Sequence, residues 1–261
     1  MRHQGERSGI SSGSVILGVA ILFLVLVGGA GIFYWQQSQV AKRSTPEAVT
    51  NEMLGDRTFG RMFRTLQKTH PTDFADLVSR MSELRSQGAP ESQVLAQGRQ
   101  MMAAKSTAMT KTLPQAPAKE LAAFRDGQVA VIESLQRHDV DQCARFTMTG
   151  LTIDQVDDAA TRPLLIDSAI TVFEASAAAR DRPANRKFTG QLSDADSLAL
   201  AQALRKQGMT DADLQAFVTP GALIKAPAAQ QCSIGLHLWR GISTLESEQA
   251  GRITAQILAL I

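Results

Sequence analysis

Aromatic, cysteine and histidine residues are all scarce in this chain of 261 residues. Aromatic side chains make up 5% of the sequence, so aliphatic residues and nine methionines must fill the interior. The four histidines are isolated, without an HExxH motif or a pair one helical turn apart. They are His3, His70, His138 and His237. We therefore expect neither a metal site nor a cofactor.

An excess of charge of one sign is also lacking. The formal net charge is +2, which leaves no general electrostatic signature for binding nucleic acid. SxxK motifs and the glycine-rich phosphate loops GxxxxGK[ST] and GxGxxG do not occur. The sequence thus predicts no catalytic residue, and Glu133 is the one helical glutamate that an enzyme acting on glycan would use.

The chain has one long apolar run, from Val15 to Trp35, and it contains no charged residue. Its length of about 20 residues matches a bilayer hydrocarbon core of roughly 30 Å. Tyr34 and Trp35 at its end favour the headgroup level. We expect a transmembrane anchor at 15–35 behind a disordered polar tail at 1–14. The alternative is a signal peptide cleaved near Gly28-Gly29-Ala30, and small residues in the run allow a homodimer without requiring one.

The orientation of this anchor is not decided by charge. Arg2 and Arg7 precede the run, and Lys42 and Arg43 follow it, so the positive-inside count nearly ties. The two cysteines both follow the run, and an even pair is typical of exported domains. We expect a single-pass bacterial inner-membrane protein with its C-terminal domain in the periplasm. The alternative is a domain facing the cytoplasm.

Each cysteine lies on an apolar face of a predicted helix. Cys143 shares its face with Val140 and Phe146, and Cys232 shares its face with Leu236 and Trp239. This placement predicts a structural disulfide that joins two core helices. Two buried free thiols are the alternative.

Helical periodicity runs through the chain after the anchor, and no alternating segment is long enough to require a sheet. The sequence therefore predicts an all-α protein. We expect a multi-helix juxtamembrane region at 36–113 and a compact helical domain at 118–261. Two prolines in the segment 114–117 predict an extended linker between them.

Two similar helix starts occur in the second region. Ser193-Asp-Ala-Asp196 and Thr210-Asp-Ala-Asp213 each place a hydroxyl at the N-cap and an acid three residues later, as a capping box requires. They predict a helix-turn-helix with no base-reading side chains in its second helix. The preceding segment, Asp181 to Gly190, is polar and basic and is expected to be exposed.

The segment from Arg57 to Lys68 is predicted to form a two-sided helix. Phe59, Met62, Phe63 and Leu66 form its apolar face. A basic stripe lies opposite and comprises Arg57, Arg61, Arg64 and Lys68. Anionic lipid headgroups attract such stripes by around 1 kcal/mol per basic residue. The stripe faces lipid or a protein partner in one interpretation and solvent in the other.

These expectations together describe a membrane-tethered accessory domain of the bacterial cell envelope that is not catalytic and acts through a protein partner. One alternative is an envelope enzyme or small-ligand-binding domain with a helical pocket. A second is a membrane adaptor that faces the cytoplasm.

Overall fold

The computed structural model describes residues 44–151, 155–219 and 221–259, and within them the chain forms helices and loops without a β-strand. The all-α prediction is confirmed. The predicted anchor at 15–35 and tail at 1–14 lie outside the described residues. Within the described part of the chain, no helix has both the length and the apolar character needed to cross a bilayer.

The helices follow one another along the chain with short connections. The first group is α3 (Pro46–Gly55), α4 (Gly60–Thr69), α5 (Pro71–Ser86) and α6 (Glu91–Thr110), followed by the 3₁₀ turn η3 (Leu113–Gln115). The second group is α7 (Ala118–His138), α8 (Val140–Thr149), α9 (Thr161–Asp181), α10 (Asp194–Lys206), α11 (Asp211–Val218), α12 (Ala222–Lys225), α13 (Ala228–Ser243) and α14 (Ser247–Ala259).

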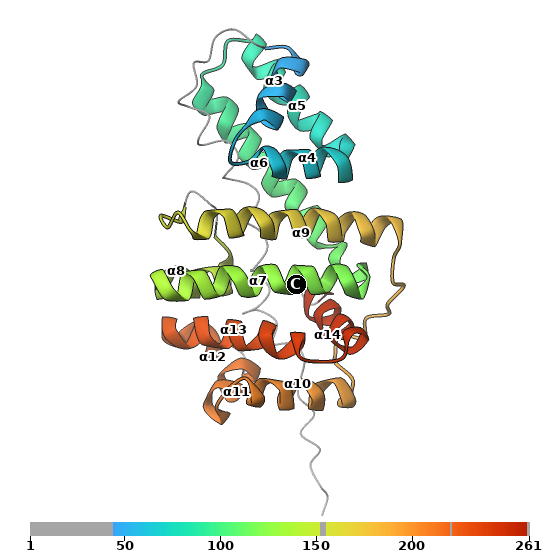
Figure 1. Cartoon of the computed structure of the whole chain (residues 1–261), viewed down its shortest axis with the longest axis vertical. Helices are drawn as coiled ribbons and strands as arrows, with labels where there is room; N and C mark the ends of the chain where they lie inside the picture. Colours follow the sequence, from blue (N-terminus) through green and yellow to red (C-terminus); the bar gives the residue numbers. More distant parts are fainter. Residues whose placement is uncertain (1–43, 152–154, 220, 260–261) are drawn as a thin grey trace, which may run out of the picture.

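The helices of the second group lie in successive layers (Figure 1). Helix α9 packs on α7, α7 packs on α13, and α13 packs on α10, while α14 contacts both α7 and η3. The first group covers the outer face of α9, chiefly through α4. One continuous hydrophobic core therefore runs through both groups.

Helix α7 lies at the centre of this arrangement, with most of its circumference buried and one exposed stripe that contains Lys119, Ala123 and Asp126. Phe124 meets Trp239 of α13 edge to face, with ring centroids 5.6 Å apart, and both side chains are fully buried. On the opposite side, α7 packs along α9. This aromatic pair therefore fills part of the contact between α7 and α13.

Polar side chains of α7 are also buried, and each one finds a partner on a neighbouring helix. Gln128 Nε2 donates to Ser168 Oγ of α9 at 2.9 Å. Arg125 Nη1 donates to Thr254 Oγ1 of α14 at 2.9 Å. These hydrogen bonds fix how α7 is rotated and shifted against its neighbours, because a slip along the helix would leave buried donors unpaired.

The segment 114–117 differs from the extended linker that its prolines predicted. Residues Leu113–Gln115 form η3, and Leu113, Pro114 and Ala116 are buried against α9 and α14. Pro114 is accommodated because it occupies the first turn of η3, where a missing N–H costs nothing. Residues 114–115 are therefore not extended, whereas Ala116 and Pro117 are, and the linker and the two-domain division stay predictions.

The helix predicted from Arg57 begins later, at Gly60. The Asp56 carboxylate accepts hydrogen bonds from the backbone N–H groups of Thr58 and Phe59, and this side-chain turn holds residues 57–59 out of the helix. Arg57 was therefore wrongly placed on the helix. The break at His70-Pro71 is confirmed, with α4 ending at Thr69 and α5 starting at Pro71.

The two predicted capping boxes have different outcomes. Thr210 and Asp213 form the complete box at the start of α11. Ser193 caps α10 by accepting from the Asp196 N–H at 3.1 Å, but the Asp196 carboxylate turns to α14 instead of closing the box. The helix-turn-helix itself is confirmed.

Two glycines lie at contacts between helices, and the space around each differs. A Cβ added to Gly235 of α13 would overlap the Thr147 side chain of α8, whereas a Cβ added to Gly127 of α7 would lie 3.4 Å from its nearest neighbour, Ser168 Cα. We predict that Gly235→Ala lowers the free energy of unfolding by about 1–3 kcal/mol through overpacking. The matched control Gly127→Ala should raise it by up to about 1 kcal/mol through helix propensity.

Urea unfolding followed by the fluorescence of the buried Trp239 measures both changes. Equal effects of the two substitutions would show that α13 and α8 are not in close contact at Gly235.

Candidate functional site

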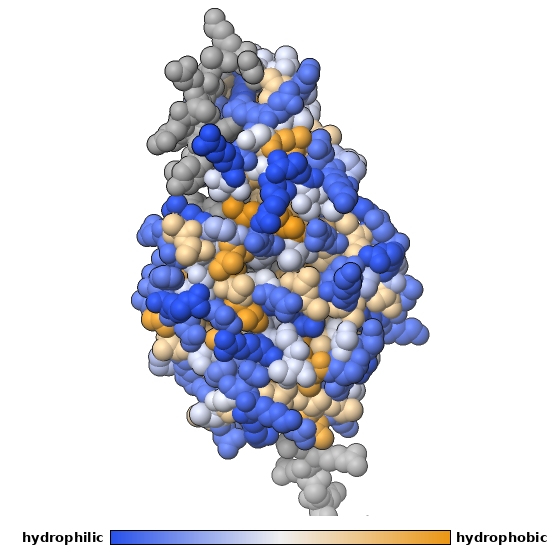
Figure 2. All heavy atoms as spheres, in the orientation of Figure 1, coloured by the Kyte–Doolittle hydropathy of each residue, from blue (hydrophilic) through white to orange (hydrophobic). Residues whose placement is uncertain are grey.

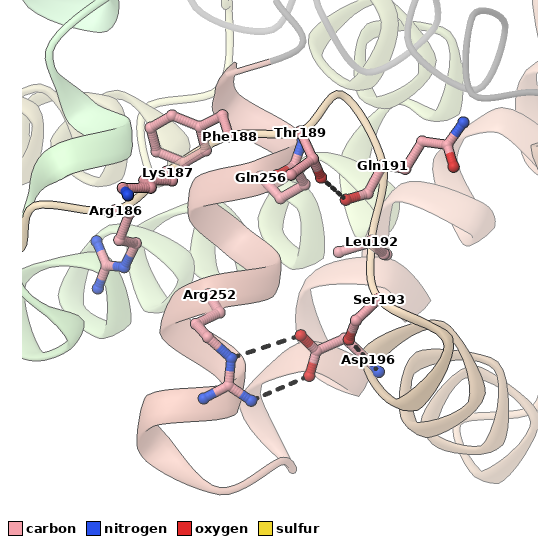
Figure 3. Close-up of a pocket in the computed structure, with 10 residues that line it drawn as sticks. All are labelled: Arg186, Lys187, Phe188, Thr189, Gln191, Leu192, Ser193, Asp196, Arg252 and Gln256. Atoms are coloured by element: carbon pink, nitrogen blue, oxygen red, sulfur yellow. Dashed lines mark hydrogen bonds and ion pairs between the residues drawn. The ribbon is translucent and has the colours of Figure 1, made fainter.

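A pocket of about 260 Å³ lies between the loop that follows α9 and the outer side of α14, next to the start of α10 (Figure 3). Its walls carry both charged and apolar side chains. The lining residues are Arg186, Lys187, Phe188, Thr189, Gln191, Leu192, Ser193, Asp196, Arg252 and Gln256. The loop 182–193 contributes most of them, α10 contributes Asp196, and α14 contributes Arg252 and Gln256.

The loop is held in place by η3. Gln115 bonds to the backbone of Arg186 in both directions: its Oε1 accepts from the Arg186 N–H and its Nε2 donates to the Arg186 carbonyl, each at 2.8 Å. The Arg186 guanidinium donates to the carbonyls of Pro114 and Ala116. Burial lowers the pKa of Arg186 from its usual value. A loop without secondary structure is therefore fixed at one wall of the pocket.

An ion pair closes the side of the pocket near α10. Arg252 Nη2 donates to Asp196 Oδ1 at 3.1 Å, and Gln249 Nε2 donates to the same carboxylate at 3.0 Å (Figure 3 draws the ion pair). Burial acts to raise the pKa of Asp196, but the hydrogen bonds from Arg252 and Gln249 outweigh it, so the pKa lies below its usual value. Asp196 is therefore ionised at neutral pH and fully engaged.

Gln256 stands out in the pocket wall. Its side chain is 7% exposed, and its Nε2 has no hydrogen-bond partner among the described residues. A buried donor without an acceptor costs about 1–3 kcal/mol, and native structures retain few of them. The amide therefore has an unused capacity to donate, which a ligand in the pocket can meet once the amide turns, because Nε2 itself is enclosed.

The pocket has an excess of positive charge. Arg186, Lys187 and Arg252 are cationic and Asp196 is the one carboxylate in the lining. Lys187 is exposed, and among the described residues it makes no ion pair. Phe188 and Leu192 are half-buried and supply apolar surface beside these charges. The arrangement suits a small ligand with a hydrogen-bond acceptor, a negative charge and an apolar part.

The two cysteines form the predicted disulfide. Cys143 of α8 is bonded to Cys232 of α13, with their Cα atoms 5.3 Å apart and both side chains fully buried. The alternative of two free thiols is therefore excluded in this structure. The bond crosses the interface at which Gly235 and Thr147 also meet.

The predicted basic stripe is only partly available to a ligand. Arg61 forms an ion pair with Asp167 of α9, and Arg64 Nη1 donates to the Leu54 carbonyl at 2.6 Å. Lys68 is exposed at the end of α4, and Arg57 is exposed in the turn before it. Two of the four residues thus tie α4 to its neighbours. Contact of the stripe with lipid or a partner stays a prediction.

The other singled-out residues are dispersed. His70 Nε2 lies 3.0 Å from the Phe173 carbonyl, His138 Nε2 lies 3.8 Å from the Asp158 carboxylate, and Glu133 is paired with Arg240. Within residues 44–151, 155–219 and 221–259, no group of three His, Cys, Asp or Glu side chains is arranged to hold a metal ion.

The pocket was not predicted from the sequence, although parts of it were visible there. The loop Asp181 to Gly190 was singled out as exposed and basic, and Asp196 was assigned to a cap. The missing part was α14, where Arg252 and Gln256 lie one turn apart on a helix that is otherwise largely apolar on its buried sides. A polar pair at this spacing on a largely apolar helix is a sequence pattern that indicates a polar site beside the helix.

Searches against protein-family models, curated proteins and solved structures found no match to this chain.

The Asp196 carboxylate generates a prediction about pH. Because its pKa is lowered on folding, its ionised form stabilises the fold at pH values above the unfolded pKa of about 3.9, and this contribution is lost as pH falls through the lower folded pKa. We predict that Asp196→Asn is less stable than the wild type near pH 7. The difference should shrink on acidification to about pH 3.

Urea midpoints of both proteins at the two pH values measure this change. Asp211→Asn, an exposed acid on α11, serves as the control. A constant difference between Asp196→Asn and wild type across this range would contradict the assigned ionisation.

The disulfide generates a second prediction. It spans 89 residues of sequence, and loop-closure entropy for a ring of this size corresponds to about 4.6 kcal/mol. The double variant Cys143→Ala, Cys232→Ala should therefore unfold at much lower urea concentration than the wild type. Adding reductant should lower the wild-type midpoint and leave that of the double variant unchanged. A variant as stable as the oxidised wild type would contradict a structural role.

Proposed function

We propose that this protein is a single-pass inner-membrane protein whose helical domain acts in the bacterial periplasm as an accessory module that binds a protein partner. The apolar run at 15–35 supplies the anchor in this proposal. Roughly ten residues separate its end from α3, which keeps the domain near the bilayer.

The disulfide is the observation that carries the proposal. Structural disulfides persist in oxidising compartments and are rare in the bacterial cytoplasm. Cys143 and Cys232 are fully buried and bonded across a close helix interface, so the bond belongs to the core of the folded domain. This supports the exported orientation over the adaptor that faces the cytoplasm.

The surface of the domain is compatible with reversible partner binding. Figure 2 shows apolar residues as separate patches among hydrophilic ones on one face of the molecule. Leu198 and Ile224 are large apolar side chains at least half exposed, on α10 and α12. Single exposed apolar residues are ordinary on protein surfaces, so binding specificity would come from a shaped site.

The second candidate is the small-ligand-binding domain, which the pocket beside α14 favours. Its volume of about 260 Å³ is below the roughly 300–1,000 Å³ of typical pockets for drug-sized ligands. It suits one or two side chains of a partner better than a large cofactor.

Cysteine labelling in spheroplasts tests the orientation. We predict that Ser92→Cys, on the exposed first turn of α6, reacts with a membrane-impermeant maleimide in intact spheroplasts. The matched variant Ser8→Cys, placed before the apolar run, should react only after lysis. The reverse pattern would establish the cytoplasmic adaptor instead.

Two further measurements on the same cells test the disulfide and the membrane anchor at 15–35. Cys143 and Cys232 should react after denaturation only when reductant is added. The protein should stay in the membrane fraction after alkaline carbonate washing. Release into the soluble fraction would show that 15–35 is a cleaved signal peptide.

A further inference from the structure

We infer that the pocket between the loop 182–193 and α14 is the docking site for an acidic segment of the protein partner, with one carboxylate inside the pocket beside an apolar side chain. This inference rests on the proposed function, because it identifies the chemistry of the partner that the domain binds.

The Gln256 amide is the first reason. Its side chain is buried in the pocket wall, and its Nε2 has no acceptor among the described residues. Figure 3 shows it projecting from α14 toward the loop. Nε2 itself is enclosed in the wall, so the amide has to turn about its last torsion, which is broad in glutamine, to present Nε2 to the pocket. An entering carboxylate oxygen then supplies the missing acceptor.

The charge of the lining is the second reason. Arg252 already pairs with Asp196, and the Arg186 guanidinium is held by backbone carbonyls. Lys187 is exposed at the pocket edge and pairs with no described carboxylate. A carboxylate that bonds to Gln256 therefore enters a site with net positive charge, in which Lys187 is free to approach it.

The apolar residues of the lining are the third reason. Phe188 and Leu192 are half-buried and lie on the loop side of the pocket, facing α14. They offer contact to an aliphatic side chain next to the acidic one. The volume of about 260 Å³ limits the occupant to one or two side chains, so a peptide segment would insert its side chains and leave its backbone at the surface.

The site is also preorganised. Gln115 and the Pro114 and Ala116 carbonyls hold the loop, and the pair of Asp196 with Arg252 fixes the opposite side. A ligand that binds to walls already in place loses less free energy to ordering them. An acidic peptide can therefore bind without refolding of the loop.

Peptide binding to the full-length chain in detergent micelles tests the inference. The probe is a fluorescent peptide library with a fixed Leu-Glu core and blocked ends, and the control library carries Leu-Gln at the same place. We expect a rise in anisotropy with the Leu-Glu library that weakens as salt increases. The Leu-Gln library should bind at least about tenfold more weakly.

Two substitutions identify the site. Gln256→Leu keeps the volume and removes the donor, and should weaken binding of the Leu-Glu library about tenfold. Lys187→Ala should weaken it about threefold and reduce its salt dependence. Lys206→Ala removes an exposed cation of α10 outside the pocket and should have no effect. Urea unfolding of each variant confirms that it folds.

Three outcomes would overturn the inference: no binding of the Leu-Glu library to the folded chain, equal binding of the two libraries, or unchanged binding by Gln256→Leu. Free glutamate serves as a competitor. If it displaces the peptide at concentrations near that of the peptide itself, the pocket binds a small molecule and the peptide assignment is wrong.

This result is separable from the test of the proposed function. Labelling of Ser92→Cys and Ser8→Cys reports orientation and does not depend on the pocket. If the labelling is as expected but the peptide does not bind, the docking site is disproved and the proposal of an exported module still stands. Peptide binding with the reverse labelling would retain the site on a cytoplasmic adaptor.

Discussion

Burial of helix α7 under three neighbouring helices is the constraint on which the rest of the fold depends. An amphipathic helix can be covered on one side, but α7 is covered by α9, α13 and α14, and α8 follows it directly. Its buried polar side chains have partners on these neighbours: Arg125 pairs with α14, and Gln128 and Ser134 pair with α9. Hydrophobic burial alone is compatible with many rotations of a helix about its axis. The hydrogen bonds of these buried donors are kept in only a few of those rotations.

The same principle builds the pocket. The loop 182–193 has no secondary structure of its own, so its polar groups need partners elsewhere, and η3 presents backbone carbonyls and the Gln115 amide to it. Helix α14 contacts η3 and α7 on one side and carries Arg252 and Gln256 toward the loop. The geometry of the pocket therefore depends on a 3₁₀ turn about seventy residues earlier in the chain.

Local signals were sufficient for much of the fold. The all-α class, the break at His70-Pro71 and the cap at Thr210 each depend on residues close together in sequence, and each was predicted. The helix starts at Gly60 and not at Arg57 because residues 57–59 form a turn, which the Asp56 side chain caps. In the segment 114–117 only Ala116 and Pro117 are extended, because Leu113–Gln115 form a 3₁₀ turn that is buried against α9 and α14. The pocket could not be predicted, since it joins η3, the loop and α14 through tertiary contacts alone.

The disulfide has a topological consequence. Cys143 and Cys232 close a covalent ring that contains α9, the loop 182–193 and α10 to α12. The first residues of that loop are exposed, as sites of proteolytic cleavage usually are. A single peptide-bond cleavage within the ring leaves one covalent molecule, with α13 and α14 still attached to α8. The domain is therefore protected against dissociation into fragments when this exposed segment is cut.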